Sequence, residues 1–492
     1  GNPLHSIKDE FRAARFGLLV QQRAELGAGQ ALRETRKILD ALGGRDQAAD
    51  AHALDHSHAH SAARGMGRRG QPGDAGADHD KVEFPHSAVL GFKRFVRSLP
   101  STIRYGFASG CFEGNRMESP GALDGIRVVE LANYVSGPYA GMMLADFGAE
   151  VIKIEVPGTG DPFRGWGTVD YSPTFGSVNR SKKSVVLDLK SEKGRAAAAK
   201  LIATADIVIE NFRPGTLERL GLGYDELRAG NPRLIWCSIT GFGNFGPLAD
   251  RPGYDTVGQA MGGLLSVLTD MDAPKPMGIS FSDHLAGMVA ANGILAALQA
   301  RHRTGRGQRV DTSLLEATVS FIGENAARFF ENGSVPDRAT RTHTAQVYAF
   351  VAGDGKPFVI HLSSPEKFWK GLTRVAGHPE WLEDPRFNPR KMRQKNYDTL
   401  HSLLSAVFAT KDREHWLRRL TEEDVPAGPL YDFAEVFADP QVGTLGMRVR
   451  VPHPKLGEVE LVRNGVRLSD TPVRVDRSSP ELGEHNREIL GE

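Results

Sequence analysis

The apolar positions between about residues 123 and 315 fall into short runs rich in β-branched side chains, separated by longer segments with helical spacing. The runs that read as strands are 126–132, 149–155, 184–189, 206–210 and 233–239. The segments that read as helices are 138–147, 191–204 and 284–303. Short apolar strands that alternate with helices are typical of a parallel sheet covered on both faces. The pattern therefore predicts an α/β fold with a Rossmann-like large domain over about 121–315.

Beyond about residue 335 the pattern changes. The segment VYAFVAGDGKPFVIHL (347–362) has the alternation of a hairpin that turns near Asp354 and Gly355. Helical spacing follows across 365–420. These elements predict a second, smaller α+β domain at 335–430.

The first 116 residues have a different composition. The stretch HALDHSHAHSAARGMGRRGQPGDAGADHD is rich in Gly, Ala, His and charge and offers little to bury. We expect 1–116 to be a disordered or appended extension, because ordered patterning begins just after Met117. The alternating His56, His58 and His60 are compatible with a metal-binding tail, but a solvated tract needs no ligand, and we predict no metal site.

The charge balance narrows the class of partner. Lys and Arg number 61 against 60 Asp and Glu, for a formal net charge of +1, and basic residues are not gathered in stripes. This balance and distribution of charge predict no nucleic-acid partner. The two cysteines, Cys111 and Cys237, lie far apart, and no run of about 18 apolar residues is evident. We therefore expect a cytoplasmic protein without a membrane span.

The segment TGFGNFGPLADRPGYD (240–255) contains a G-x-G-x-x-G directly after a predicted strand. A dinucleotide fingerprint needs its third glycine to open a long helix that holds the pyrophosphate. Here Pro252 and Gly253 follow soon after Gly246 and would end such a helix. The motif therefore predicts a loop and argues against an oxidoreductase. The chain also lacks a G-x-x-x-x-G-K-[ST] phosphate loop.

Six motifs in order resemble the family III CoA-transferases, which include formyl-CoA transferase and the carnitine CoA-transferases. They are LDGIRVVELANYVSGPYAGMMLADFGAEVIKIE, NRSKKSVVLDLKSEKG, ADIVIENFRPGTLERLGLGYDEL, SITGFGNFGPLADRPGYDTVGQAMGGLLS, TGRGQRVDTSLLEA and ELGEHNREIL. The resemblance spans about 121–492 and implies that 431–492 completes the large domain. It also implies two chains interlocked as a homodimer, no tightly bound cofactor, and a coenzyme A thioester as substrate.

The family's nucleophilic aspartate matches Asp283 in GISFSDHLAGM. Read from the residues alone, Asp283 is an N-cap for a helix that begins near His284. The two roles are compatible, because a helix N-terminus favours an ionised carboxylate by about 0.3–1 kcal/mol. The resemblance implies attack of this carboxylate on a thioester, through an aspartyl anhydride and an aspartyl-CoA thioester.

Other positions match family residues around the CoA and acyl groups. The resemblance assigns CoA binding to Asn211, Phe212, Arg213, Arg219, Leu187, Asp188 and Lys190. It assigns substrate contacts to Tyr254, Asp255, Trp166 and Val135. Each set has an ordinary structural alternative: solvated arginines in a helix-start loop, strand packing for Leu187, a core tryptophan, and a turn after Gly253.

The chain departs from formyl-CoA transferase in places that bear on the acid. Val135 replaces a glutamine, Val156 replaces an arginine, and the polyglycine loop is absent, with 337–350 in its region. We therefore expect a larger acid than formate, with succinyl-CoA as donor and a dicarboxylate as acceptor. Arg341 and His343 could receive the distal carboxylate.

Two alternatives carry different functions. A 2-methylacyl-CoA racemase of the same fold would need a histidine where the chain has Tyr254, and the family's further glutamate is replaced near Val351. Tyrosine ionises only near pH of about 10 and is a poor base at neutral pH. The other alternative is a CoA-binding protein without activity, against which the presence of Asp283 argues.

Overall fold

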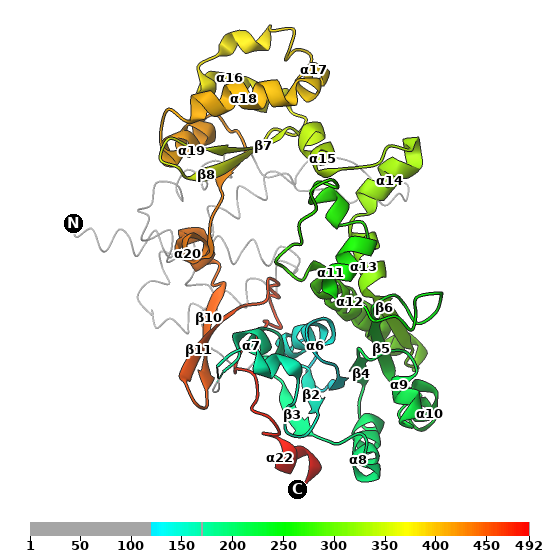
Figure 1. Ribbon diagram of the computed structural model, residues 1–492. Helices are drawn as coiled ribbons and strands as arrows, with labels where there is room; N and C mark the ends of the chain where they lie inside the picture. The colour runs from blue at the N-terminus through cyan, green and yellow to red at the C-terminus, as the bar shows by residue number, and fades with distance from the viewer. Residues whose placement is uncertain (1–119, 169–170, 492) are drawn as a thin grey trace, which may run out of the picture. The chain divides into compact units, whose positions relative to one another are not determined.

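The computed structural model describes residues 120–168 and 171–491. A six-stranded, all-parallel sheet forms the large part of the fold, in the order β3-β2-β1-β4-β5-β6 (Figure 1). Its strands are β1 (Arg127–Leu131), β2 (Glu150–Glu155), β3 (Lys183–Val186), β4 (Ile207–Glu210), β5 (Ile235–Thr240) and β6 (Arg309–Ser313). This is the strand order of doubly wound dinucleotide-type folds. The predicted α/β, Rossmann-like sheet is confirmed.

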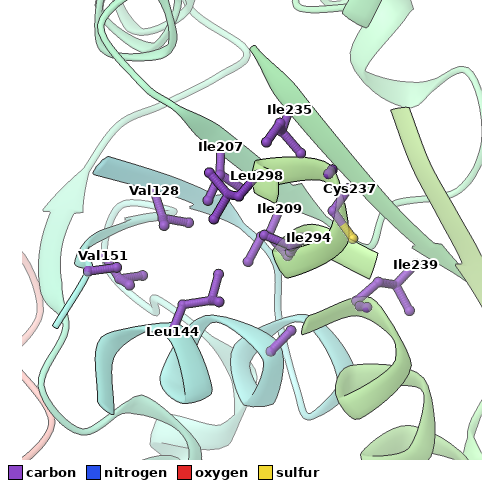
Figure 2. Close-up of a cluster of buried hydrophobic side chains, with 14 of the residues drawn as sticks. Val128, Leu144, Val151, Ile207, Ile209, Ile235, Cys237, Ile239, Ile294 and Leu298 are labelled. Atoms are coloured by element: carbon purple, nitrogen blue, oxygen red, sulfur yellow. The ribbon is translucent and has the colours of Figure 1, made fainter. Parts of the chain in front are cut away.

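Two apolar layers cover the two faces of this sheet. Side chains alternate along a strand, so Val128 of β1 packs in one cluster and Val129 in the other. Figure 2 shows the first cluster, where Leu144 of α6 (Ser136–Asp146) and Ile294 of α12 (Phe281–Thr304) lie with sheet residues such as Ile209. The second cluster contains Val129, Ile152, Val185 and Val208 with Ala198 and Ile202 of α8 (Glu192–Ala203). The core therefore has the two-sided burial that the near-continuous apolar strands predicted.

Helix α12 is long and apolar enough to cross a membrane by length and composition alone, with a mean hydropathy of 1.2 over its best window. The apolar run expected to be absent is therefore present in this helix. Its buried residues include Ala286, Ala290 and Ile294, which pack in the cluster between the sheet and α6. The helices approach closely, since a Cβ on Gly287 would stand 2.7 Å from the Ser136 carbonyl oxygen. Packing in this core accounts for the buried apolar residues of α12, while Met288 and Val289 of the same helix are exposed.

A second set of elements surrounds a three-stranded antiparallel sheet, β7-β8-β9. Its strands are β7 (Val347–Val351), β8 (Pro357–His361) and β9 (Ala427–Pro429). The β7–β8 hairpin turns through Gly355 at φ +79°, as expected near Asp354 and Gly355. An aromatic core packs these strands with α16 (Glu366–Ala376), α18 (Tyr397–Phe408) and α19 (Arg413–Glu422). The domain limits at 335–430 stay a prediction.

The last residues return to the edge strand of the large sheet. The Ser184 amide donates to Nδ1 of His485 (3.3 Å), and the Val186 amide donates to Oδ1 of Asn486 (2.8 Å). Before them, β10 (Arg448–His453) and β11 (Gly457–Val462) form an antiparallel hairpin. The remaining helices are η1 (Pro162–Gly165), α7 (Pro173–Asn179), α9 (Thr216–Arg219), α10 (Tyr224–Gly230), α11 (Asp255–Met261), η2 (Leu265–Val267), α13 (Leu314–Phe321), α14 (Gly323–Asn332), α15 (Arg338–Ala345), η3 (Pro379–Leu382), α17 (Arg390–Lys395), α20 (Phe433–Ala438), α21 (Pro440–Thr444) and α22 (Asn486–Leu490).

The expectations about 1–116, including the alternating histidines and Cys111, lie outside the described residues.

Candidate functional site

The predicted site residues gather at the carboxyl edge of the parallel sheet. Because all six strands are parallel, the loops that follow them leave from one edge. Val135 follows β1, Leu187 follows β3, Asn211 follows β4, and the glycine segment follows β5. Helix α12 connects β5 to β6, so its N-terminus, with Asp283, lies at the same edge. In open α/β sheets ligands bind outside the carboxyl ends of the strands where the order reverses, here between β1 and β4.

Asn211 fastens the two loops that meet at this reversal. Its Oδ1 accepts from the Asn133 amide (3.0 Å), and its Nδ2 donates to the Asn133 carbonyl oxygen (2.8 Å). Both ends of the amide side chain are therefore engaged by the loop after β1. Asn211 therefore holds the loop after β4 against the loop after β1. Its partner is Asn133, which the sequence did not single out.

The structure corrects the capping expectation for Asp283. Helix α12 begins at Phe281 with Ser280 in the N-cap position, so Asp283 lies within the first turn. No side chain in the N-cap position closes the helix; instead, the amide of Asp283 donates to Oδ1 of Asp255 at 3.3 Å. Asp255 is the first residue of α11, and it satisfies one of the free amides at the start of α12. The cap of this turn thus comes from another helix, which local sequence could not reveal.

The expected preference for an ionised Asp283 is also corrected. Burial, and then the negative charge of Asp255, raise the pKa of Asp283 to about 7. The helix dipole favours the anion by only about 0.3–1 kcal/mol, which is smaller than the effect of removing a carboxylate from water beside a second carboxylate. Two carboxyl groups with one of them held protonated near neutral pH are typical of a reactive site.

The glycine segment is a loop closed at its base, as predicted. A Cβ on Gly241 would stand 2.9 Å from the Cα of Gly253, so the two ends of the loop touch through their backbones. Gly243 and Gly246 have φ of +100° and +92°, backbone angles that residues other than glycine rarely adopt. The next helix, α11, starts only at Asp255. Absence of a helix at Gly246 removes the basis for a dinucleotide site in this segment.

Aromatic rings gather at the start of α11 and at the loop after β1. Tyr134, at φ +64°, contacts Tyr254 edge to face with ring centroids 6.0 Å apart, and it contacts Phe163 in the same way at 5.5 Å. Trp166 packs on Phe163 at 4.7 Å but is 63% exposed, so it is not a core tryptophan. Tyr254 is 64% exposed. Both predicted substrate residues therefore offer an open aromatic surface.

Val135 has a different environment from the one predicted. Its side chain is 6% exposed and packs with Phe163, Phe175 and Val178. In this structure it contributes to the packing below the loop after β1.

A buried network of charges supports this loop from beneath. Lys153 is 0% exposed and its Nζ lies 2.9 Å from Glu130 Oε1, 2.9 Å from Asp161 Oδ2 and 2.6 Å from the Ala132 carbonyl oxygen. Asp161 Oδ1 in turn accepts from the Tyr134 amide at 3.3 Å. Although burial alone would lower it, the pKa of Lys153 is raised by the carboxylates of Glu130 and Asp161. The sequence signal was a lysine inside the apolar strand EVIKIE, and its role was missed.

A pocket of about 330 Å³ lies where β4 and β5 end. Arg213, Arg309 and Asn244 line it, so the loop after β4 and the glycine loop both contribute. Arg213 is exposed and has no ion-pair partner among the described residues. Glu210 and Glu218 also line it; Glu210 is buried, and burial raises its pKa to about 7. Arg309 pairs with Asp311 at 3.1 Å. The pocket therefore has mixed charge, with Arg213 as its exposed cation, and Arg309 is a lining residue that the sequence did not suggest.

The other predicted CoA contacts have local partners. Arg219 donates to Oγ1 of Thr216 (3.1 Å) at the surface, and Phe212 packs partly against the second apolar cluster. Leu187 is buried, while Asp188 accepts from the Lys190 amide at 2.9 Å in an exposed turn. Arg213 alone of these seven is among the residues that line the described pocket.

Within residues 120–168 and 171–491, no group of three or more His, Cys, Asp or Glu could hold a metal ion. A doubly wound sheet with a partly buried aspartate of raised pKa and an arginine-lined pocket at its carboxyl edge is typical of an α/β enzyme.

Comparison with known proteins identifies the enzyme family. Residues 123–486 match CoA-transferase family III. This chain belongs to that family and is a CoA-transferase. The succinyl-CoA–D-citramalate CoA-transferase of Chloroflexus aurantiacus is 38% identical over 377 residues, which are 75% of this chain and 94% of that protein.

One further relative and one solved structure support this membership. The succinate–glutarate CoA-transferase of Agrobacterium fabrum is 36% identical over 380 residues, 75% of this chain and 95% of that protein. A crystal structure of a CAIB/BAIF family protein from Brucella suis superposes with a TM-score of 0.68 at 37% identity, covering 76% of this chain and 99% of the other.

Proposed function

We propose that this enzyme transfers CoA from succinyl-CoA to a carboxylic acid, with Asp283 as the nucleophile. The observation that carries the proposal is the position of Asp283, partly buried beside Asp255 at the carboxyl edge of the sheet. The names of relatives that use succinyl-CoA support the donor.

The chemistry follows from the properties of a thioester. The ionised Asp283 carboxylate attacks the thioester carbonyl and expels CoA thiolate, which leaves an aspartyl-acyl anhydride. The thiolate then attacks the aspartyl carbonyl, releasing the first acid and forming an aspartyl-CoA thioester. An incoming carboxylate attacks this thioester and expels the thiolate, giving a second mixed anhydride. The thiolate attacks the acceptor carbonyl of that anhydride and frees Asp283.

Water must be kept from the anhydride, since it hydrolyses readily. The glycine loop, closed at Gly241 and Gly253, and the exposed aromatic rings of Tyr254 and Trp166 are placed to shield the site once substrate is bound.

Arg213 and Arg309 are suited to the phosphates of CoA. Both line the pocket at the ends of β4 and β5, and guanidinium groups bind phosphate through paired N–H donors. In this proposal Phe212 packs beside the nucleotide, and Arg219, Leu187, Asp188 and Lys190 extend the same edge. Asn211 acts through the loop that it fastens.

A dicarboxylate is the proposed acceptor, as the relatives named for citramalate and glutarate suggest. The contacts of Arg341 and His343 do not favour them as receivers of the distal carboxylate. Arg341 pairs with Glu324 at 3.0 Å, and His343 stacks on Tyr397 at 4.1 Å. The comparisons do not favour a racemase, and the position that would need a histidine is Tyr254.

We also propose a homodimer in the cytoplasm, with a large domain of 121–315 completed by 431–492 and a small domain at 335–430. Exposed apolar side chains on α12 to α14 support a partner copy. They are Met288, Val289, Val319, Phe321, Phe329 and Phe330. Gel filtration at micromolar concentration is expected to give a dimer, and a monomer would contradict this part.

The decisive test is incubation with succinyl-CoA and a panel of mono- and dicarboxylic acids without ATP, with every acyl-CoA read by mass spectrometry. We expect a new thioester to appear as succinyl-CoA is lost, and to vanish in Asp283→Ala. Transfer at the full rate in Asp283→Ala would refute the mechanism. Exchange of the α-hydrogen of a 2-methylacyl-CoA without transfer would favour the racemase instead.

A further inference from the structure

We infer that Gln259 is a positioning residue that holds the Asp255 carboxylate against the first turn of α12, where it acts on Asp283. The inference rests on the proposed function insofar as Asp283 is the nucleophile. Gln259 lies in α11, one turn after Asp255, and is 0% exposed.

The contacts of Gln259 are specific. Its Nε2 donates to Oδ2 of Asp255 at 2.5 Å and to the Ile279 carbonyl oxygen at 3.0 Å. The other carboxylate oxygen of Asp255, Oδ1, accepts from the Asp283 amide at 3.3 Å. The carboxylate of Asp255 is thus held from both sides, by Gln259 and by the turn that carries the nucleophile.

Gln259 also links the segment that carries Asp255 to the segment that leads into α12 and Asp283. Ile279 precedes α12, so one amide group links α11, the approach to α12 and Asp255. Its Oε1 is buried and has no hydrogen-bond partner among the described residues. A buried amide that leaves its acceptor unpaired is costly, which argues that its donors are placed for a purpose.

The donors of Gln259 fix the place from which the Asp255 carboxylate acts. After burial, the negative charge of Asp255 is the second cause that raises the pKa of Asp283, and the interaction between two charges weakens as they move apart. A raised pKa makes Asp283 a more basic nucleophile when it does ionise. Without the donors, the Asp255 side chain is free to turn away from the first turn of α12, and Asp283 ionises at lower pH.

Other charged or titratable groups on elements packed against α12 do not account for this effect. Asp146 of α6 is paired with Arg180, and Glu316 of α13 accepts from Ser313 Oγ. The rest are His284 in the first turn of α12, Arg301, His302 and Arg303 in its last turn, Tyr139 of α6, Tyr254 at the start of α11, Cys237 of β5, and Arg309 and Asp311 of β6. Asp255 is the charge that acts on Asp283.

The test measures protonation of Asp283 without requiring turnover. A carbodiimide with glycine ethyl ester modifies protonated carboxyl groups, and peptide mass spectrometry reports labelling at Asp283 across pH 5–9. Gln259→Met keeps the shape and removes the donors, and we expect about tenfold less labelling of Asp283 at pH 7, matching Asp255→Asn. In the Asp255→Asn background, Gln259→Met should change nothing further.

Gln259→Leu also removes the donors without adding a charge, and it should lower the labelling in the same way. It is the second variant should Gln259→Met fail to fold, as judged by its melting temperature. Unchanged or increased labelling of Asp283 in a folded Gln259→Met or Gln259→Leu protein would overturn the inference. Absence of CoA transfer in the parent protein would instead defeat the proposed function and leave the labelling result intact.

Discussion

The amide of Asp283 donates to Oδ1 of Asp255 at 3.3 Å, so the first turn of α12 is capped by a carboxylate that also opposes ionisation of Asp283. One contact therefore has two consequences. It satisfies a free amide at the helix start, and it places a negative charge where a second one must form. Such arrangements trade stability for reactivity.

CoA transfer is expected to rise with pH through the neutral range. Asp283 must be ionised to attack, and its pKa is raised to about 7. The fraction ionised grows about tenfold between pH 6 and pH 8. The measurement is kcat/KM for succinyl-CoA from pH 5 to pH 9 in constant ionic strength, and a flat profile over this range would contradict the assignment.

Asp283→Asn is expected to make the fold more stable at pH 8. The native pKa of about 7 lies above the ordinary 3.8, so the folded state binds the proton more tightly and stability is lost as pH rises from about 4 to 7. An amide does not ionise and avoids this loss, a difference on the order of 4 kcal/mol. Urea unfolding at pH 8 tests the gain. The difference from the parent should shrink toward pH 4, and an equal difference at both pH values would argue against titration of Asp283 as its cause.

Lys153→Met should weaken the fold strongly. It leaves Glu130 and Asp161 as buried carboxylates without this partner, which costs about 3–5 kcal/mol. Urea unfolding measures the loss. The matched control is Arg338→Met, which breaks a pair with Asp270 in which both side chains are more than half exposed, and no measurable change is expected. Equal losses of unfolding free energy in the two variants would mean that the buried network stabilises the fold no more than an exposed ion pair does.

Arg213→Ala should raise KM for the CoA thioester about tenfold or more, with a smaller change in kcat. It removes a guanidinium that lines the pocket and binds phosphate in the proposed complex. Steady-state kinetics with succinyl-CoA measures it. Arg303→Ala is the control, since this exposed arginine lies in the last turn of α12, away from the Asp283 end. A shift of KM in the control alone would place CoA elsewhere.

Gly241→Ala should lower kcat about tenfold or more. The added Cβ would meet the Gly253 backbone at 2.9 Å and force the base of the glycine loop open. Gly278→Ala is a fair comparison, because nothing lies within 4 Å of the Cβ it adds. Hydrolysis of succinyl-CoA without transfer, measured beside the transfer rate, would report water reaching the anhydride. Normal kinetics in Gly241→Ala would show that closure of the loop base is unimportant.

Local pattern predicted what depends on local chemistry. The strand and helix alternation was found because each apolar run carries its own burial signal, and the turn at Gly355 was found because few residues adopt its backbone. The helix start at Phe281 was missed. In this first turn the amide of Asp283 donates to Asp255, which lies 28 residues earlier in the chain, so no nearby residue signals the helix start.

Lys153, Asn133, Arg309 and Gln259 were missed for a related reason. Each owes its role to partners from other elements: the carboxylates around Lys153, the Asn211 amide, the pocket wall, and the Asp255 carboxylate. A single sequence records residue types but not these distances.

By itself, the sequence determined an α/β fold, the loop nature of the glycine motif and, through six ordered motifs, the family, and it predicted Asp283 as the nucleophile. The tertiary structure decided the protonation of Asp283, the bracing by Asn211 and Gln259, and the burial of Val135. Periodicity and turn chemistry act between near neighbours along the chain. A pKa is set by burial and by charges brought close only when distant segments pack together.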